Sequence, residues 1–90
     1  MDNDYKFVHT QYGYCYYSIE SDGSALLYNL YIEPDDRRKG NARYLIDLVI
    51  KEIKRSGCFG PIRVEAIPRE NSIDINTLSL FYRQMGLVIF

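Results

Sequence analysis

The sequence predicts an α+β (α/β) fold: a mixed sheet in which an antiparallel N-terminal meander is followed by a βαβ unit, a second helix and a short last strand. Three observations predict it. Residues 1–33 hold three short strand-like stretches separated by brief turns. A hydrophobic period of 3.6 residues begins at Ala42, and a second one begins near Asp74 after a further strand-like run.

The N-terminal meander consists of three expected strands. They run from Tyr5 to Thr10, from Tyr14 to Glu20 and from Ala25 to Glu33. The turn between the first two is Gln11–Gly13, and the turn before the third is Ser21–Ser24, with Asp-Gly at its centre. Short turns between consecutive strands predict antiparallel pairing.

The third strand ends in an alternating pattern. We expect Tyr28, Leu30 and Ile32 to share one face, with the residues between them on the other face. Pro34 cannot donate a ladder hydrogen bond, so the strand should end there.

A helix is expected from Asn41 to Arg55, and Gly57 is a natural stop after it. Its apolar stripe consists of Ala42, Leu45, Ile46, Val49 and Ile53. The run Ile62–Ile67 after Pro61 predicts a fourth strand, which a right-handed crossover should place parallel to the third.

The second helix is expected from Asp74 to Gln84, with Leu78, Phe81, Tyr82 and Met85 on one face. Gly86 should end it, and Leu87–Phe90 should form the last strand.

Composition limits the functional classes. Ninety residues predict one domain spanning 1–90. A net charge of −1 argues against direct nucleic-acid binding. No apolar run approaches about 18 residues and no signal-peptide pattern opens the chain, so we expect no membrane contact and a cytoplasmic location. Cys15 and Cys58 lack metal-ligand spacing, so we expect buried thiols and no metal site.

The segment between the third strand and the first helix is the clearest functional signal. Arg37, Arg38 and Lys39 are followed by Gly40 at the expected helix start. Helix N-terminal amides lack intrahelical partners, and glycine lets a ligand approach the main chain closely. The segment therefore predicts a phosphate-binding loop. It lacks both the Gly-x-Gly-x-x-Gly of dinucleotide sites and the Gly-Lys-Ser/Thr of nucleoside triphosphate sites.

This loop resembles the acetyl-CoA loop of the GNAT superfamily of N-acetyltransferases, Arg/Gln-x-x-Gly-x-Gly/Ala after a hydrophobic-x-Pro strand end. Ile32-x-Pro34-x-x-Arg37-x-x-Gly40-x-Ala42 meets each position. The resemblance implies that main-chain groups near Leu30 and Ile32 bind the pantetheine of acetyl-CoA. It also implies a set of pyrophosphate-binding residues: Arg37, Arg38, Lys39, Gly40, Asn41 and Ala42.

A second motif resembles the same superfamily. Leu78-x-x-Phe81-Tyr82-x-x-x-Gly86-Leu87 is similar to a pattern whose tyrosine protonates the departing thiolate, which implies Tyr82 as general acid. Tyr82 could instead be a core aromatic of its helix. The Asn position of that pattern holds Ile75, so the remaining pantetheine contact would come from a nearby polar residue: Asn71, Ser72 or Asn76.

The resemblance covers roughly residues 13 to 90, and a narrower one is to very small phage-encoded acetyltransferases of the type V anti-CRISPR kind. It rests on Gly13-Tyr-x-x-Tyr-Ser-Ile-Glu20 and Ser72-Ile-x-x-x-x-Leu78, together with the loop motif. The stretch of sequence between the first two strands is too short to hold the superfamily's usual pair of helices. Their absence implies an open groove for a protein lysine. The end at Phe90 implies an exposed sheet edge, which leads us to expect a homodimer.

The expected function is acetyl transfer from acetyl-CoA to a primary amine, with a protein as the substrate. Glu65 is the first candidate for the general base, and Glu33, Tyr28 or a water chain are alternatives. The rival class is a non-catalytic acetyl-CoA-binding or protein-interaction module. A third interpretation, nucleic-acid binding, would use the basic residues Arg37, Arg38, Lys39, Arg43, Lys51, Lys54 and Arg55.

Overall fold

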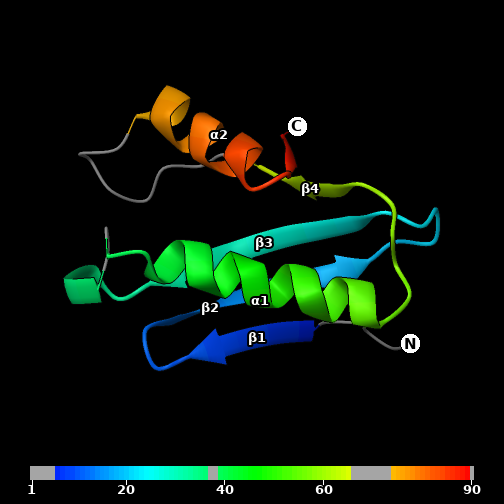
Figure 1. The fold of residues 1–90 in the computed structure, drawn as a ribbon, viewed down its shortest axis with the longest axis horizontal. Helices are drawn as coiled ribbons and strands as arrows, with labels where there is room; N and C mark the ends of the chain where they lie inside the picture. The colour runs from blue at the N-terminus through cyan, green and yellow to red at the C-terminus, as the bar shows by residue number, and fades with distance from the viewer. Residues whose placement is uncertain (1–5, 37–38, 66–73, 90) are drawn as a thin grey trace.

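The computed structural model describes residues 6–36, 39–65 and 74–89, which form one five-stranded sheet and two α-helices (Figure 1). The strands lie in the order β1-β2-β3-β4-β5. Their bounds are β1 Lys6–Thr10, β2 Gly13–Ile19, β3 Ala25–Ile32, β4 Ile62–Val64 and β5 Val88–Ile89. The β1–β2 and β2–β3 pairs are antiparallel, and the β3–β4 and β4–β5 pairs are parallel, which confirms the expected meander and βαβ unit.

The helices connect the parallel strands. Helix α1, Asn41–Arg55, follows a 3-10 turn, η1, at Pro34–Asp36 and leads from β3 to β4. Helix α2, Ile75–Gln84, leads from β4 to β5. Successive right-handed crossovers in one direction across a sheet place both helices on the same face. Figure 1 shows α1 lying across β1, β2 and β3 on that face.

The core lies between α1 and this inner face of the sheet. The expected stripe of α1 is confirmed, since Leu45, Ile46, Val49 and Ile53 are fully buried and Ala42 packs against them. Strand residues opposite them are Cys15, Tyr17, Ala25, Leu27 and Ile32. Burial raises the pKa of the Cys15 thiol to about 12, which fits the expectation of a packed, unreactive cysteine.

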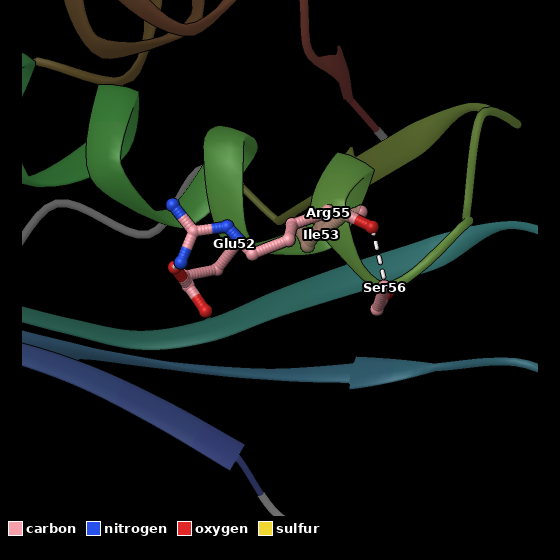
Figure 2. A network of polar contacts seen from close by, with 4 residues as sticks. All are labelled: Glu52, Ile53, Arg55 and Ser56. Atoms are coloured by element: carbon pink, nitrogen blue, oxygen red, sulfur yellow. Dashed lines mark hydrogen bonds and ion pairs between the residues drawn. The ribbon is translucent and has the colours of Figure 1, made fainter.

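The end of α1 is fixed by local contacts (Figure 2). The Ser56 hydroxyl donates to the carbonyl of Ile53 at 2.6 Å, and Arg55 forms an exposed ion pair with Glu52 at 3.0 Å. Gly57 follows with φ of 95°, a left-handed conformation that ends the helix where the sequence indicated.

The alternation expected in β3 is wrong at Tyr28. Tyr14 pairs with Tyr31 and Tyr16 pairs with Tyr28, so two residues of β3 lie opposite the single residue Cys15. This β-bulge contains Asn29, whose φ is 55°. The extra residue shifts the alternation by one position. Tyr28 therefore lies with Tyr16 on the outer face of the sheet, while Leu30 and Ile32 face the core as expected.

The remaining boundaries differ by a few residues. β4 is described only over Ile62–Val64, whereas Ile62–Ile67 was expected, and residues 66–73 lie outside the described residues. α2 begins at Ile75 because Asp74 serves as its N-cap. The Asp-Gly turn is confirmed, with the carboxylate of Asp22 accepting from the amide of Ser24 at 3.0 Å.

Candidate active site

The N-terminus of α1 follows β3 and η1 in the chain and lies directly after Gly40. Gly40 has φ of 83° and is the N-cap residue, and no side chain within the described ranges caps the helix. The first intrahelical bond runs from the amide of Tyr44 to the carbonyl of Gly40 at 3.1 Å. The amides before Tyr44 have no intrahelical acceptor and Gly40 is exposed, so this helix end suits an anion.

The loop before α1 is closed by a side chain. The side-chain amide of Asn41 donates to the carbonyl of Asp36 at 2.8 Å. This bond holds η1 against the first turn of α1. Lys39 is exposed beside Gly40. Arg37 and Arg38 lie outside the described residues, so their expected role stays a prediction. The described part of the loop therefore has one cationic side chain, an exposed backbone at Gly40, and a hydrogen bond that fixes the chain before α1.

The first turn of α1 contacts the last turn of α2. The guanidinium of Arg43 lies 3.2 Å from the Met85 sulfur, and its central carbon lies 5.6 Å from the centre of the Phe81 ring. Tyr82 belongs to this same turn of α2. The two sequence motifs, about forty residues apart, are thus brought to one place.

Tyr82 is the buried residue of α2, with 5% of its surface exposed. Its ring centre lies 5.7 Å from that of Phe81, and its carbonyl accepts from the amide of Leu87 at 3.1 Å. The side chain is therefore fixed in position by the core. A general acid needs that rigidity, and a packing residue would show it as well, so both interpretations of Tyr82 remain predictions.

The carboxyl half of β3 holds the expected pantetheine contacts. Ladder pairing with β4 is described for Ala25–Leu27. Leu30 belongs to the bulge, and Ile32 follows it. A β-bulge bends a strand and redirects its groups, as often happens next to an active site. Asn71 and Ser72 lie outside the described residues.

The candidate bases lie on the other side of the sheet. In β4, Ile62 and Val64 are buried whereas Arg63 is exposed, and Glu65, directly after the strand, is exposed as well. Glu33 is also exposed, and its carboxylate accepts from the Tyr31 hydroxyl at 3.4 Å. These groups lie on or near the outer face, whereas Tyr82 is buried in the core.

Sequence reasoning missed the structural roles of two residues. Asn29 makes the bulge, and its signal was an asparagine inside a strand, because asparagine is rare in strands and tolerates left-handed backbone. Arg43 connects the two helices. The sequence indicated it by placing a cation in the first turn of a helix, where the helix dipole disfavours positive charge.

Among the described residues, no group of three or more His, Cys, Asp or Glu side chains could hold a metal ion. No helix in the same residues has the length and apolar character to cross a membrane.

The fold has a solved counterpart, although no family model and no curated protein sequence matches the chain. The structure is similar to the crystal structure of the ribosomal-protein-S18-alanine N-acetyltransferase from Escherichia coli, with a TM-score of 0.64 and 17% sequence identity. The match covers 93% of this chain and 54% of that chain, so the present chain spans about half the length of this relative. The chain therefore has a GNAT-like fold, with a five-stranded mixed sheet and two helices.

Proposed function

We propose that the protein transfers an acetyl group from acetyl-CoA to a primary amine of a protein lysine. One observation carries this proposal: Arg43 holds the uncapped start of α1 against the turn of α2 that contains Tyr82. This contact supports the proposal, because it brings the helix start that would bind an anion to the turn that holds the candidate proton donor. The GNAT-like fold and the two sequence motifs support the same reaction.

The start of α1 would bind the pyrophosphate. Amides of Asn41 and Ala42 would donate to phosphate oxygens, and Arg37, Arg38 and Lys39 would add positive charge. The open space at Gly40, where a Cβ would meet no described atom within 4 Å, leaves room for this approach. The pantetheine would then run along β3 by Leu30 and Ile32.

Transfer requires two proton movements. The amine nitrogen attacks the thioester carbonyl, the carbon–sulfur bond breaks, and acetyl is joined to nitrogen. Tyr82 would give its hydroxyl proton to the departing thiolate, and Glu65 would accept the proton that the amine loses. Glu33, Tyr28 or water remain alternatives to Glu65.

The acceptor we propose is a side chain on a folded protein. A two-residue turn joins β1 to β2, and neither described helix covers the outer face of the sheet. A large acceptor therefore has access that a small enclosed pocket would not give. The narrower sequence resemblance to phage acetyltransferases that act on a nuclease supports a protein acceptor as well.

A second candidate function is acetyl-CoA binding without transfer. The burial of Tyr82 favours it, because a packed core tyrosine needs no chemical role. In that case the protein would bind acetyl-CoA and leave every amine unmodified.

The deciding experiment is incubation of the protein with acetyl-CoA and a bacterial lysate, followed by mass spectrometry for acetyl-lysine. A matched incubation without the protein controls for spontaneous acetylation. Release of the CoA thiol with a new acetyl-lysine supports transfer. Tight acetyl-CoA binding in calorimetry with no new acetyl-lysine would favour the binding module.

A further inference from the structure

The outer face of the sheet carries a row of aromatic side chains that the core does not use. Cys15 and Tyr17 of β2 point inward, so Tyr14 and Tyr16 point outward. Phe7 stacks on Tyr16 with ring centres 5.5 Å apart, and 55% of Phe7 is exposed. Cross-strand ring pairs stabilise the sheet, and a contiguous exposed patch of aromatic rings also marks an interaction site.

Two of these rings make a corner. Tyr14 and Tyr16 have ring centres 5.6 Å apart and an interplanar angle of 85°, so they form two perpendicular walls. The corner stands directly over the bulge of β3, because the Tyr14–Tyr31 and Tyr16–Tyr28 pairs flank it. Because of the bulge, Tyr31 of β3 lies on the outer face as well as Tyr28. Tyr31 stacks on Tyr14 with ring centres 5.4 Å apart.

A pocket of about 330 Å³ opens at this corner. Phe7, Tyr14 and Tyr16 line it together with His9 and the carboxylate residue Glu33. Within the described part of the chain, no lysine or arginine lines it. Its volume is at the lower end of the range for small ligands, which suits one side chain rather than a coenzyme.

The chemistry of this lining selects a cation. Aromatic faces carry negative potential and attract ammonium groups, and perpendicular rings can present their faces to one charge. Glu33 adds a formal negative charge, and its hydrogen bond from Tyr31 orients the carboxylate. A lysine side chain supplies both an ammonium and an apolar stem for the rings, and it is charged at neutral pH.

We propose that the pocket formed by Phe7, Tyr14, Tyr16 and Glu33 is the subsite that binds the ammonium group of the acceptor lysine. The inference rests on the acetyl transfer proposed above, because it assigns the lysine nitrogen a binding place before that reaction. The bound ammonium would first pass one proton to Glu33, since only the neutral amine can attack the thioester, and the two proton movements described above would follow. Glu33 follows directly after β3, the strand along which the pantetheine would run. The pocket therefore lies at the same end of the sheet as the start of α1.

The test uses a probe that needs no turnover. Nα-acetyl-lysine methylamide is titrated into the whole chain, and the ring resonances of Phe7, Tyr14 and Tyr16 are followed by NMR. Nα-acetyl-norleucine methylamide, which lacks the ammonium, is the matched control. We expect the lysine probe to shift these resonances and the norleucine probe to leave them nearly unchanged.

Variants separate the parts of the pocket. Glu33→Gln should weaken binding of the lysine probe about tenfold. Tyr14→Leu should weaken it about fivefold, whereas Tyr14→Phe keeps the ring face and should stay near wild type. Phe59→Leu, at a residue 78% exposed outside the pocket, is the control. Thermal melting of each variant checks that it is folded. If a tyrosine variant unfolds, the binding measurement on Glu33→Gln tests the subsite, because Glu33 is exposed and its replacement should leave the protein folded.

Three results would overturn the inference: equal shifts by both probes, no shift by the lysine probe, or a dimer that buries the face and dissociates in Tyr14→Leu during sedimentation. Failure of the subsite and failure of the reaction can be told apart. Acetyl transfer without selective lysine binding here refutes the subsite alone. Selective lysine binding in a protein that never transfers acetyl refutes the reaction alone.

Discussion

The two helices of this protein begin in opposite ways. At the start of α2, the carboxylate of Asp74 accepts from the amide of Thr77 at 2.7 Å, and this bond lowers the pKa of Asp74. At the start of α1, Gly40 offers no side chain and no acidic residue occupies the first turn. Both helices have the same unsatisfied amides. At α2 the side chain of Asp74 satisfies one of them, whereas at α1 no described side chain does so and the amides stay open to an external anion.

The largest expected effect comes from filling the space at Gly40. Gly40→Val adds a branched side chain where phosphate should approach, so we expect acetyl-CoA binding to be lost in calorimetry. The left-handed backbone adds a strain of about 1–2 kcal/mol to the folded state. Binding and stability must therefore be measured on the same protein.

Gly57→Val is the matched control for this variant. Gly57 also has a positive φ, and a Cβ added there would likewise meet no described atom within 4 Å, but it lies at the opposite end of α1. We expect a similar loss of melting temperature with unchanged acetyl-CoA affinity. Equal affinity for Gly40→Val and wild type would contradict the phosphate site.

The second effect concerns the end of α2 that faces α1. Tyr82→Phe keeps the ring and its packing but removes the hydroxyl proton. Turnover should fall by roughly 10²-fold while acetyl-CoA affinity is unchanged. Steady-state kinetics and thermal melting on one sample separate this outcome from a structural role, which would lower stability and leave turnover near wild type.

Much of the fold could be predicted from the sequence because local patterns and tertiary packing agree. The stripe of α1 and its stop at Gly57 are examples, since period and glycine chemistry act within one turn. The bulge at Asn29 could not be predicted from alternation, because it depends on the register with β2. Alternation along β2 does place Tyr14 and Tyr16 on one face of the sheet. The perpendicular setting of their rings could not be predicted in this way, because Phe7 of β1 and Tyr31 of β3 pack against them across the strands.

The third effect tests charge at the start of α1. Lys39→Ala removes the described cation beside Gly40 and should weaken acetyl-CoA binding about tenfold, the scale of one charge-assisted contact. Lys54→Ala removes a cation that is also exposed, in the last turn of the same helix, and should leave affinity unchanged. Calorimetry at two salt concentrations should show a larger salt effect for wild type than for Lys39→Ala. Equal weakening by both variants would indicate a general charge effect instead of a local one.

The smallest effect on binding is expected at the capped helix, where Asp74→Ala should leave acetyl-CoA affinity unchanged and lower the melting temperature. The alanine leaves the amide of Thr77 without its acceptor, whereas Asp74→Asn keeps a neutral cap. Because the pKa of Asp74 is lowered in the folded state, its charge stabilises the fold above the ordinary aspartate pKa. That contribution is lost as pH falls through the lowered value. The difference in melting temperature between wild type and Asp74→Asn should therefore stay constant near neutral pH and shrink as pH falls below about 4. A loss of acetyl-CoA affinity in folded Asp74→Ala would mean that the start of α2 also serves the coenzyme, and the contrast between the two helices would fail.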